Sequence, residues 1–343
     1  MFMKLKLALL GLVGLVFVSR VSVAQTPPPA AAVVPEVTIK CATLAPEGTT
    51  MTNSLKTMSK ELATRTGGKV VFKMYYGGTA GDEKDVVRKM RIGQLNCGAL
   101  TGVGLGMIEP EFRVLELPFL FKNYSAADHV MKEMRPYFET KIREKGFELL
   151  GWAEVGFVNI FSNKPITKKA DLTGVKFWMW EGDVLAQTMF EKLGIVPIPL
   201  ALTDVLTSLQ TGLIDGCYAP PLGAIAFQWH TKTKYVTDVP LVDATGGIIV
   251  SKATWDSLKP EYQTILKEVI TAESQKLITN SRSDNVKSLE VLKGMGLTVN
   301  QLTPEALAEL QAISKDVGTT LVSKALFSQA ILDKVTQLAA SAP

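Results

Sequence analysis

Two tryptophans and two acidic residues stand close together in residues 174–183, which read GVKFWMWEGD. Trp178 and Trp180 are two positions apart in a strand-like run, so their indole rings should lie on one face of that strand. Each ring offers a large apolar surface and one N–H donor. Glu181 and Asp183 follow directly, and carboxylates beside aromatic rings can enclose an organic cation. The stretch predicts a binding site for an apolar, aromatic or cationic solute, unless both rings only pack against a covering helix.

Residues that carry catalysis or bind metals are few in this chain. The two histidines, His129 and His230, are far apart and in no ligand pattern. Cys41, Cys97 and Cys217 show neither CxxC nor Cys/His spacing, and we interpret all three as small buried residues. A GxSxG motif is absent, and GVGLGM departs from GxGxxG at its last position. We therefore expect no enzyme, no cofactor and no metal site.

The N-terminus has the pattern of a secretory signal peptide over residues 1–24. Two lysines precede a short apolar run, and Ser22-Val23-Ala24 supplies the small residues of a cleavage site. The run is shorter than the roughly 18 to 20 apolar residues of a membrane span. We expect cleavage after Ala24, a Pro/Ala linker over residues 25–35, and a mature protein free in the periplasm.

Charge gives no indication of a nucleic-acid partner. The signal peptide contains three of the 37 lysines and arginines, which leaves 34 against 33 acidic residues in the mature chain. Basic and acidic residues alternate, as in ETKIREKGFE, whereas nucleic-acid binding requires a clustered basic surface.

The same order of strand, helix, strand, helix and strand occurs twice. The first run has its expected elements at residues 36–44, 50–65, 69–76, 82–92 and 94–100, and the second at 174–180, 183–193, 195–200, 203–211 and 213–219. Gly93 and Gly212 each follow the second helix of a run, at a C-cap position. Apolar strands separated by helices predict an α/β fold with mainly parallel sheets flanked by helices.

About 305 residues follow the linker, more than one core usually organises, so we expect two domains. A helix over residues 260–292 would span about 50 Å and brace both. Ligands of parallel sheets bind beyond the carboxyl ends of the strands. The expected cleft is therefore lined by residues 44–49, 76–79, 100–104, 178–183, 200–203 and 218–221.

Four segments carry a family resemblance: residues 77–96, 112–130, 174–183 and 198–216. In this order they resemble the solute-binding proteins of the tripartite ATP-independent periplasmic (TRAP) transporters, in the DctP family, and the resemblance covers nearly the whole mature chain. It implies a periplasmic binding protein fold that closes around a small solute and delivers it to the small and large membrane subunits of a permease.

The resemblance also implies crossing hinge strands and a bridging helix. We expect the hinge near residues 155–161 and 243–248. The expected domains are domain I, residues 36–154 and about 245–280, and domain II, residues 155–244 and about 281–343.

The chain departs from the family at the positions that bind a carboxylate. Trp178 stands where the family has an arginine that holds the ligand carboxylate through two parallel hydrogen bonds. Val158 stands at about the position of a second family arginine, and Ala219 replaces a family asparagine. A carboxylate enclosed without a charged partner costs several kcal/mol. The three residues present offer apolar area instead, at about 25 cal/mol per Å² buried, with the indole N–H of Trp178 as a polar group.

We therefore expect a receptor for an apolar or aromatic solute. The expected ligand-binding residues are Trp178, Trp180, Phe157, Val158, Tyr218, Ala219, Glu181 and Trp229. The first alternative is an organic acid bound by a relocated lysine, Lys56 or Lys73, and the second is an organic cation held by Glu181 and Asp183.

The partner also has alternatives. The receptor could report to a sensor protein instead of a permease, and a TPR-repeat periplasmic protein is a further candidate partner. We expect a monomer.

Overall fold

The structure is a computed structural model that describes residues 34–342 of the chain. The predicted signal peptide and the predicted linker up to residue 33 lie outside the described residues. Within residues 34–342, no helix combines the length and hydrophobicity that a membrane span requires.

The larger sheet has five strands in the order β2-β1-β3-β10-β4. Their bounds are β1 Val37–Thr43, β2 Val70–Tyr75, β3 Cys97–Thr101, β4 Phe147–Phe157 and β10 Asp243–Ser251. β1 pairs in parallel with β2 and β3, as the first run predicts. β10 runs antiparallel to β3 and β4, so this sheet is mixed. β10 follows the second run in the chain. It therefore enters this sheet from the other half of the molecule, in the direction opposite to β3.

Helices cover both faces of this sheet. α1 (Thr50–Arg65) packs with the long helix α9 (Pro260–Gly294) against one face, through a shared apolar cluster. α2 (Glu83–Arg91), α3 (Gly102–Ile108) and α4 (Tyr124–Glu144) contribute to the cluster on the other. Gly93 and Gly212 have φ of +74° and +71°, the left-handed conformation expected after a helix end.

The strands of the second run belong to a smaller and more divided sheet. Its strands are β5 Asn159–Ser162, β6 Trp178–Trp180, β7 Ile198–Leu200, β8 Gly216–Ala219, β9 Tyr235–Thr237 and β11 Thr298–Asn300. Four of them pair in the order β11-β9-β5-β8, while β6 and β7 form a separate parallel pair. A parallel bridge from Phe177 to Gly216 joins the two groups. The strands of the second run are thus parallel in the order β7-β6-β8, as predicted, although a single bridge joins β6 to β8. On its other side β8 pairs antiparallel with β5, so this sheet is also mixed.

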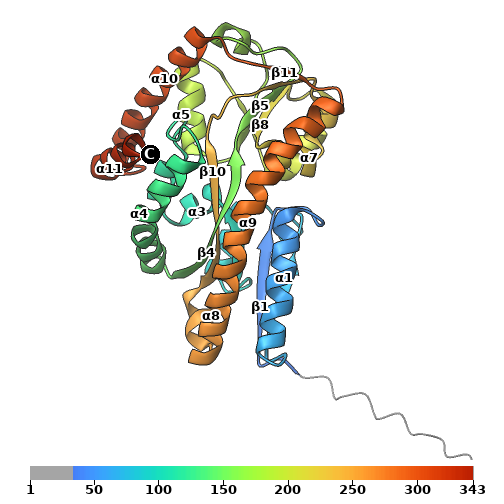
Figure 1. Ribbon diagram of the computed structural model, residues 1–343, viewed down its shortest axis with the longest axis vertical. Coiled ribbons are helices and arrows are strands. Elements are labelled where there is room, and N and C mark those ends of the chain that lie inside the picture. The colour runs from blue at the N-terminus through green and yellow to red at the C-terminus, as the bar shows by residue number, and fades with distance from the viewer. Residues whose placement is uncertain (1–33, 343) are drawn as a thin grey trace, which may run out of the picture. The chain divides into compact units, whose positions relative to one another are not determined.

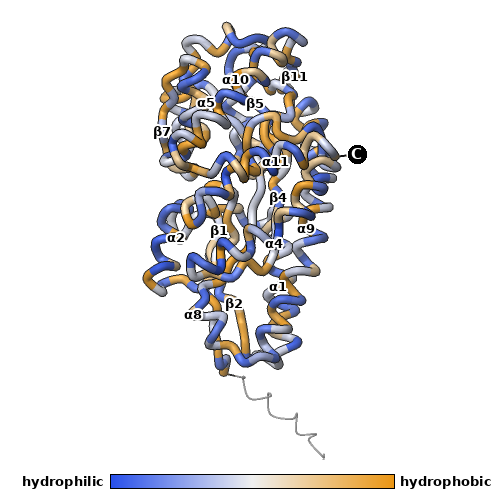
Figure 2. The backbone as a smooth tube through the Cα atoms, turned by 90° about the vertical axis from the view of Figure 1, so that its left-hand side faces the viewer, coloured by the Kyte–Doolittle hydropathy of each residue, from blue (hydrophilic) through white to orange (hydrophobic). Residues whose placement is uncertain are grey.

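The long helix α9 (Pro260–Gly294) ends two residues beyond the predicted end at residue 292. It packs on β4 and α1 at one end and on α7 (Pro221–Ala226) at the other, so it contacts both halves (Figure 1). Hydrophilic and hydrophobic residues alternate along α1 and α9 (Figure 2), as expected for helices with one buried face. The predicted brace is confirmed in position.

The other helices fill the space between these elements. The α-helices are α5 Val184–Leu193, α6 Val205–Thr211, α8 Lys252–Ser257, α10 Pro304–Ser323 and α11 Gln329–Ser341. The 3-10 helices are η1 Pro110–Glu116, η2 Lys169–Leu172, η3 Leu202–Asp204 and η4 Trp229–Lys232.

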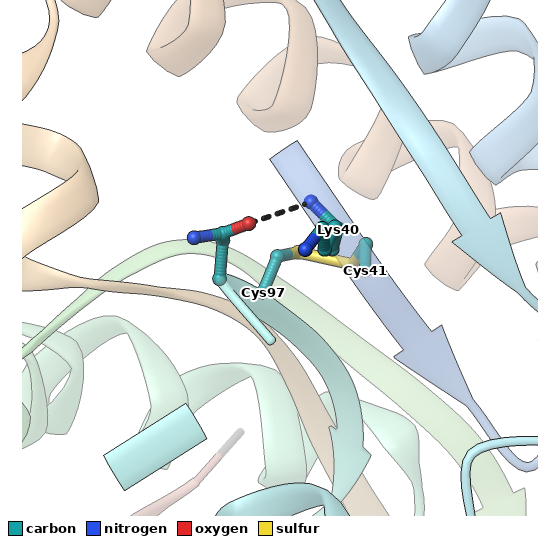
Figure 3. Close-up of a disulfide and its surroundings, with 4 residues drawn as sticks. Lys40, Cys41 and Cys97 are labelled. Carbon is teal, nitrogen blue, oxygen red and sulfur yellow. Dashed lines mark hydrogen bonds between the residues drawn. A yellow bond between two sulfur atoms is a disulfide. The ribbon is translucent and has the colours of Figure 1, made fainter. Parts of the chain in front are cut away.

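Cys41 and Cys97 are buried, as predicted, but they form a disulfide that their spacing did not indicate (Figure 3). The parallel register of β1 and β3 sets the two residues directly opposite each other, with their Cα atoms 4.2 Å apart. Spacing along the chain carries no information about that register. Cys217 is free and buried, as predicted.

Candidate functional site

A pocket of about 280 Å³ lies between the two sheets. Five of the six predicted cleft segments line it, with these residues: Leu44, Ala45, Leu100, Thr101, Val103, Trp178, Trp180, Asp183, Leu202, Tyr218, Ala219 and Pro220. The exception is residues 76–79. These residues form a turn that is bonded to the segment after β1, because the Gly77 N–H donates to Ala45 O at 3.0 Å. Gly78 faces Thr203 so closely that a Cβ there would lie 2.8 Å from the threonine methyl group.

Aromatic rings form one wall of the pocket. The Trp178 ring stacks on Tyr218 with centroids 4.8 Å apart, meets Trp229 edge-on at 5.3 Å, and lies 6.0 Å from Trp180. The two indole rings therefore share a face, as the strand alternation predicts. Trp178 is 1% exposed, so it belongs to the core as well as to the pocket wall.

Both indole N–H groups are already used within the protein. Trp178 Nε1 donates to Leu200 O at 3.0 Å, and Trp180 Nε1 donates to Asp82 Oδ1 at 3.0 Å. The expectation that Trp178 offers its N–H to a solute was therefore wrong, because a buried donor takes a backbone acceptor within reach.

Three further predicted residues, Val158, Ala219 and Trp229, also line the pocket, while Phe157 and Glu181 do not. Phe157 packs on Tyr124, with ring centroids 4.8 Å apart. Glu181 is exposed and forms an ion pair with Lys84. Because only Asp183 of the two carboxylates lines the pocket, the predicted acidic cage is not formed.

The lysines proposed as a relocated cation also lie elsewhere. Lys56 pairs with Glu47 at the surface, and Lys73 lies over the ring of Tyr75 at 5.7 Å. Neither lines the pocket.

Sequence reasoning missed Arg113, which lines the pocket from η1. Its Nη2 donates to both carboxylate oxygens of Asp183 at 2.9 Å, and its Nη1 donates to Glu116. Glu116 also accepts from Thr245, at 2.8 Å from the backbone N–H and 3.1 Å from Oγ1. A single arginine inside the apolar run FRVLELPFLF was the signal that could have identified it.

Asp183 has a second structural task at the start of α5. Its Oδ1 accepts from the backbone N–H groups of Leu185 at 3.0 Å and Ala186 at 3.1 Å. These are donors that the first turn of a helix leaves unpaired. Asp183 thus joins the N-terminus of α5 to Arg113.

Glu83, from the first turn of α2, is the fourth charged residue of the pocket lining. Its carboxylate accepts from Thr101 N, Thr101 Oγ1 and Gly104 N, each at 2.7 Å. Burial raises its pKa to about 7, because desolvation outweighs these hydrogen bonds.

Asp82, the N-cap of α2, connects the two sides of the pocket. Its Oδ1 accepts from Trp180 Nε1, and its Oδ2 accepts from Leu202 N at 2.9 Å.

In residues 34–342 no group of three histidine, cysteine or acidic residues could hold a metal ion.

Two α/β halves with a solute-sized pocket between them define a two-domain periplasmic binding protein fold. The chain belongs to the bacterial extracellular solute-binding proteins, family 7 (DctP), whose family model matches residues 41–324. The chain is 28% identical over 271 residues to the C4-dicarboxylate-binding periplasmic protein DctP of Rhodobacter capsulatus, covering 77% of this chain and 80% of that one.

Solved structures show the same fold. The sugar acid binding protein DctPAm from Advenella mimigardefordensis strain DPN7T, in complex with galactonate, matches with a TM-score of 0.84 and 22% identity, covering 89% of this chain and 98% of that chain. A TRAP periplasmic solute binding protein from Roseobacter denitrificans with bound β-D-glucuronate matches with a TM-score of 0.82 and 22% identity, covering 89% and 100%.

The family assigns a transport role to the chain. TRAP solute-binding proteins are extracytoplasmic receptors that bind small molecules and deliver them to membrane permease subunits. The family is one of transport receptors and not of enzymes.

Proposed function

We propose that this chain is a periplasmic TRAP receptor for a small neutral solute, apolar or aromatic, that it delivers to the small and large permease subunits. The observation that carries the proposal is the lining of the pocket. Apart from a cluster of charged residues that bond to one another or to the backbone, it is built mainly from aliphatic and aromatic side chains.

A carboxylate solute would find no free cation there. Arg113 is the one basic residue of the pocket lining within residues 34–342, and two carboxylates already occupy it. An anion beside Glu116 and Asp183 would lose its water and meet like charges. The solved relatives with galactonate and glucuronate therefore share the fold of this chain but differ from it in the proposed solute.

The choice between neutral and acidic solutes can be tested with matched pairs. We suggest benzamide with benzoate and cyclohexanecarboxamide with cyclohexanecarboxylate, together with galactonate, glucuronate and succinate. Thermal shift and calorimetry should show tighter binding of the amides than of the matching acids. Native mass spectrometry of the protein as purified would add the identity of any retained solute. A retained organic acid, or tighter binding of the acids, would contradict the proposal.

The partner proposals rest on the family alone. A permease is the proposed recipient of the solute, and a sensor protein is the alternative. A permease gene beside the receptor gene would disfavour the sensor. We also retain the monomeric state and a TPR-repeat periplasmic partner as proposals, which light scattering and co-purification can test.

A further inference from the structure

Arg113 and Asp183 form an ion pair inside the pocket. Their side chains are only 8% and 4% exposed, and each lines the pocket. They are 70 residues apart, with Arg113 on η1 beside the five-stranded sheet and Asp183 at the start of α5 after β6. The pair therefore joins the two halves of the molecule at the place where a solute would lie.

The Asp183 carboxylate accepts hydrogen bonds from the Arg113 guanidinium, as the carboxylate of an acidic solute would. Both of its oxygens lie 2.9 Å from Nη2 of Arg113. Guanidinium groups are the side chains best suited to hold carboxylates. An incoming carboxylate would have to displace one that is held covalently by the chain and anchored on the first turn of α5.

Helix capping alone does not require a charge at residue 183. Asparagine and serine cap helices about as well as aspartate. Charge compensation of Arg113 does not require it either, because Glu116 bonds to the same guanidinium. With Asp183 the cluster contains two carboxylates and one guanidinium, and the surplus negative charge repels anions.

We infer that Asp183 is a specificity-determining residue, whose carboxylate occupies Arg113 from within the chain and thereby excludes acidic solutes from the pocket. The inference rests on the proposed function, since it gives the reason why a neutral solute is preferred. It also identifies Arg113 as a latent carboxylate site.

The test replaces Asp183 by residues that still cap α5. Asp183→Ser removes the charge and also makes room beside Nη2 of Arg113, whereas Asp183→Asn removes the charge but leaves the volume filled. Calorimetry with the same acids and amides should show that Asp183→Ser binds at least one acid tenfold or more tighter than the parent does. The gain for Asp183→Asn should be smaller, and in both variants the ratio of acid affinity to amide affinity should rise above that of the parent.

Glu148→Gln is a matched control, because Glu148 pairs with Arg143 through a side chain that is 10% exposed, away from the pocket. It should alter stability without any gain of acid binding. If no acid gains affinity in either Asp183 variant, or if Glu148→Gln produces the same gain, the inference is wrong. A parent protein that prefers the acids, or binds no amide, would instead contradict the proposed function.

Discussion

Trp178 belongs to the pocket wall and to a buried aromatic cluster at the same time. It packs on Tyr218 and Trp229, and its indole N–H bonds to Leu200 O. A substitution must therefore lower stability, and a loss of solute binding has to be separated from that loss by a control.

Trp178→Leu should weaken binding of a neutral aromatic solute at least tenfold, about 1.4 kcal/mol, because it removes the stacking surface. It should also lower the free energy of unfolding, by less than the about 3 to 5 kcal/mol that truncation of a buried tryptophan to alanine costs. Trp152→Leu is the matched control, since Trp152 is 5% exposed, stacks on Phe112 and lies outside the pocket lining. Calorimetry and denaturant unfolding on both variants measure the two effects. Equal affinity in the two variants would make Trp178 a packing residue only.

Glu83 makes stability depend on pH. Its pKa is about 7 in the folded state, raised from 4.5 by burial, so between these values the folded state retains a proton that the unfolded state has released. Stability should therefore fall as pH rises from 4.5 to 7 and level off above, by at most about 3 kcal/mol.

Denaturant unfolding across pH 4.5 to 8 checks this slope. Burial also raises the pKa of Asp243 and contributes in the same direction. Glu83→Gln should therefore flatten the curve only in part, and an unchanged slope in this variant would show that Glu83 is not responsible.

At the scale of elements, the N-terminus of α2 is tied to β6 and to the residues after β7. Asp82 caps α2 and accepts hydrogen bonds from Trp180 Nε1 and Leu202 N, which belong to the other half of the molecule. The pocket can open here only if both bonds break.

Asp82→Ala should speed solute release at least fivefold, because these two bonds are lost. Thr303→Ala is the control, since Thr303 caps α10 without a bond across the pocket. Each change should cost about 1 kcal/mol of stability as a lost cap. Stopped-flow fluorescence of the pocket tryptophans gives the release rate. Identical rates in the two variants would mean that Asp82 acts only as a cap.

At the scale of the whole molecule, the chain passes between the two sheets at two places, and we propose that the molecule bends there. β4 ends at Phe157 in the five-stranded sheet and β5 begins at Asn159 in the other. β10 begins at Asp243, opposite Phe157. We retain the expected domain division, residues 36–154 with 245–280 and 155–244 with 281–343, as the proposal for which parts move.

Binding of a solute should compact the protein by closing these two parts on each other. Small-angle X-ray scattering of the purified protein, with and without a tightly bound amide, should show a smaller radius of gyration in the complex. The same amide with the Trp178→Leu variant serves as the comparison at weak occupancy. A radius that stays the same at saturating solute would argue against hinge closure.

The sequence alone determined the family and most of the elements that build the fold. Helices such as α1, α2 and α9 follow from local apolar spacing, Gly93 and Gly212 follow from the geometry of a helix end, and the family follows from motifs that are contiguous in the chain. Local patterns predict these features because the atoms that decide them lie within a few residues of one another.

The tertiary structure decided which side chains meet. The disulfide joins residues 56 apart through a strand register, and Arg113 meets Asp183 across 70 residues. The antiparallel strand β5 was added to the parallel strands of the second run, and the indole N–H of Trp178, expected to face a solute, was taken by Leu200. Such contacts depend on how separate elements pack, so the apolar pocket was predictable by position while the state of its one arginine was not.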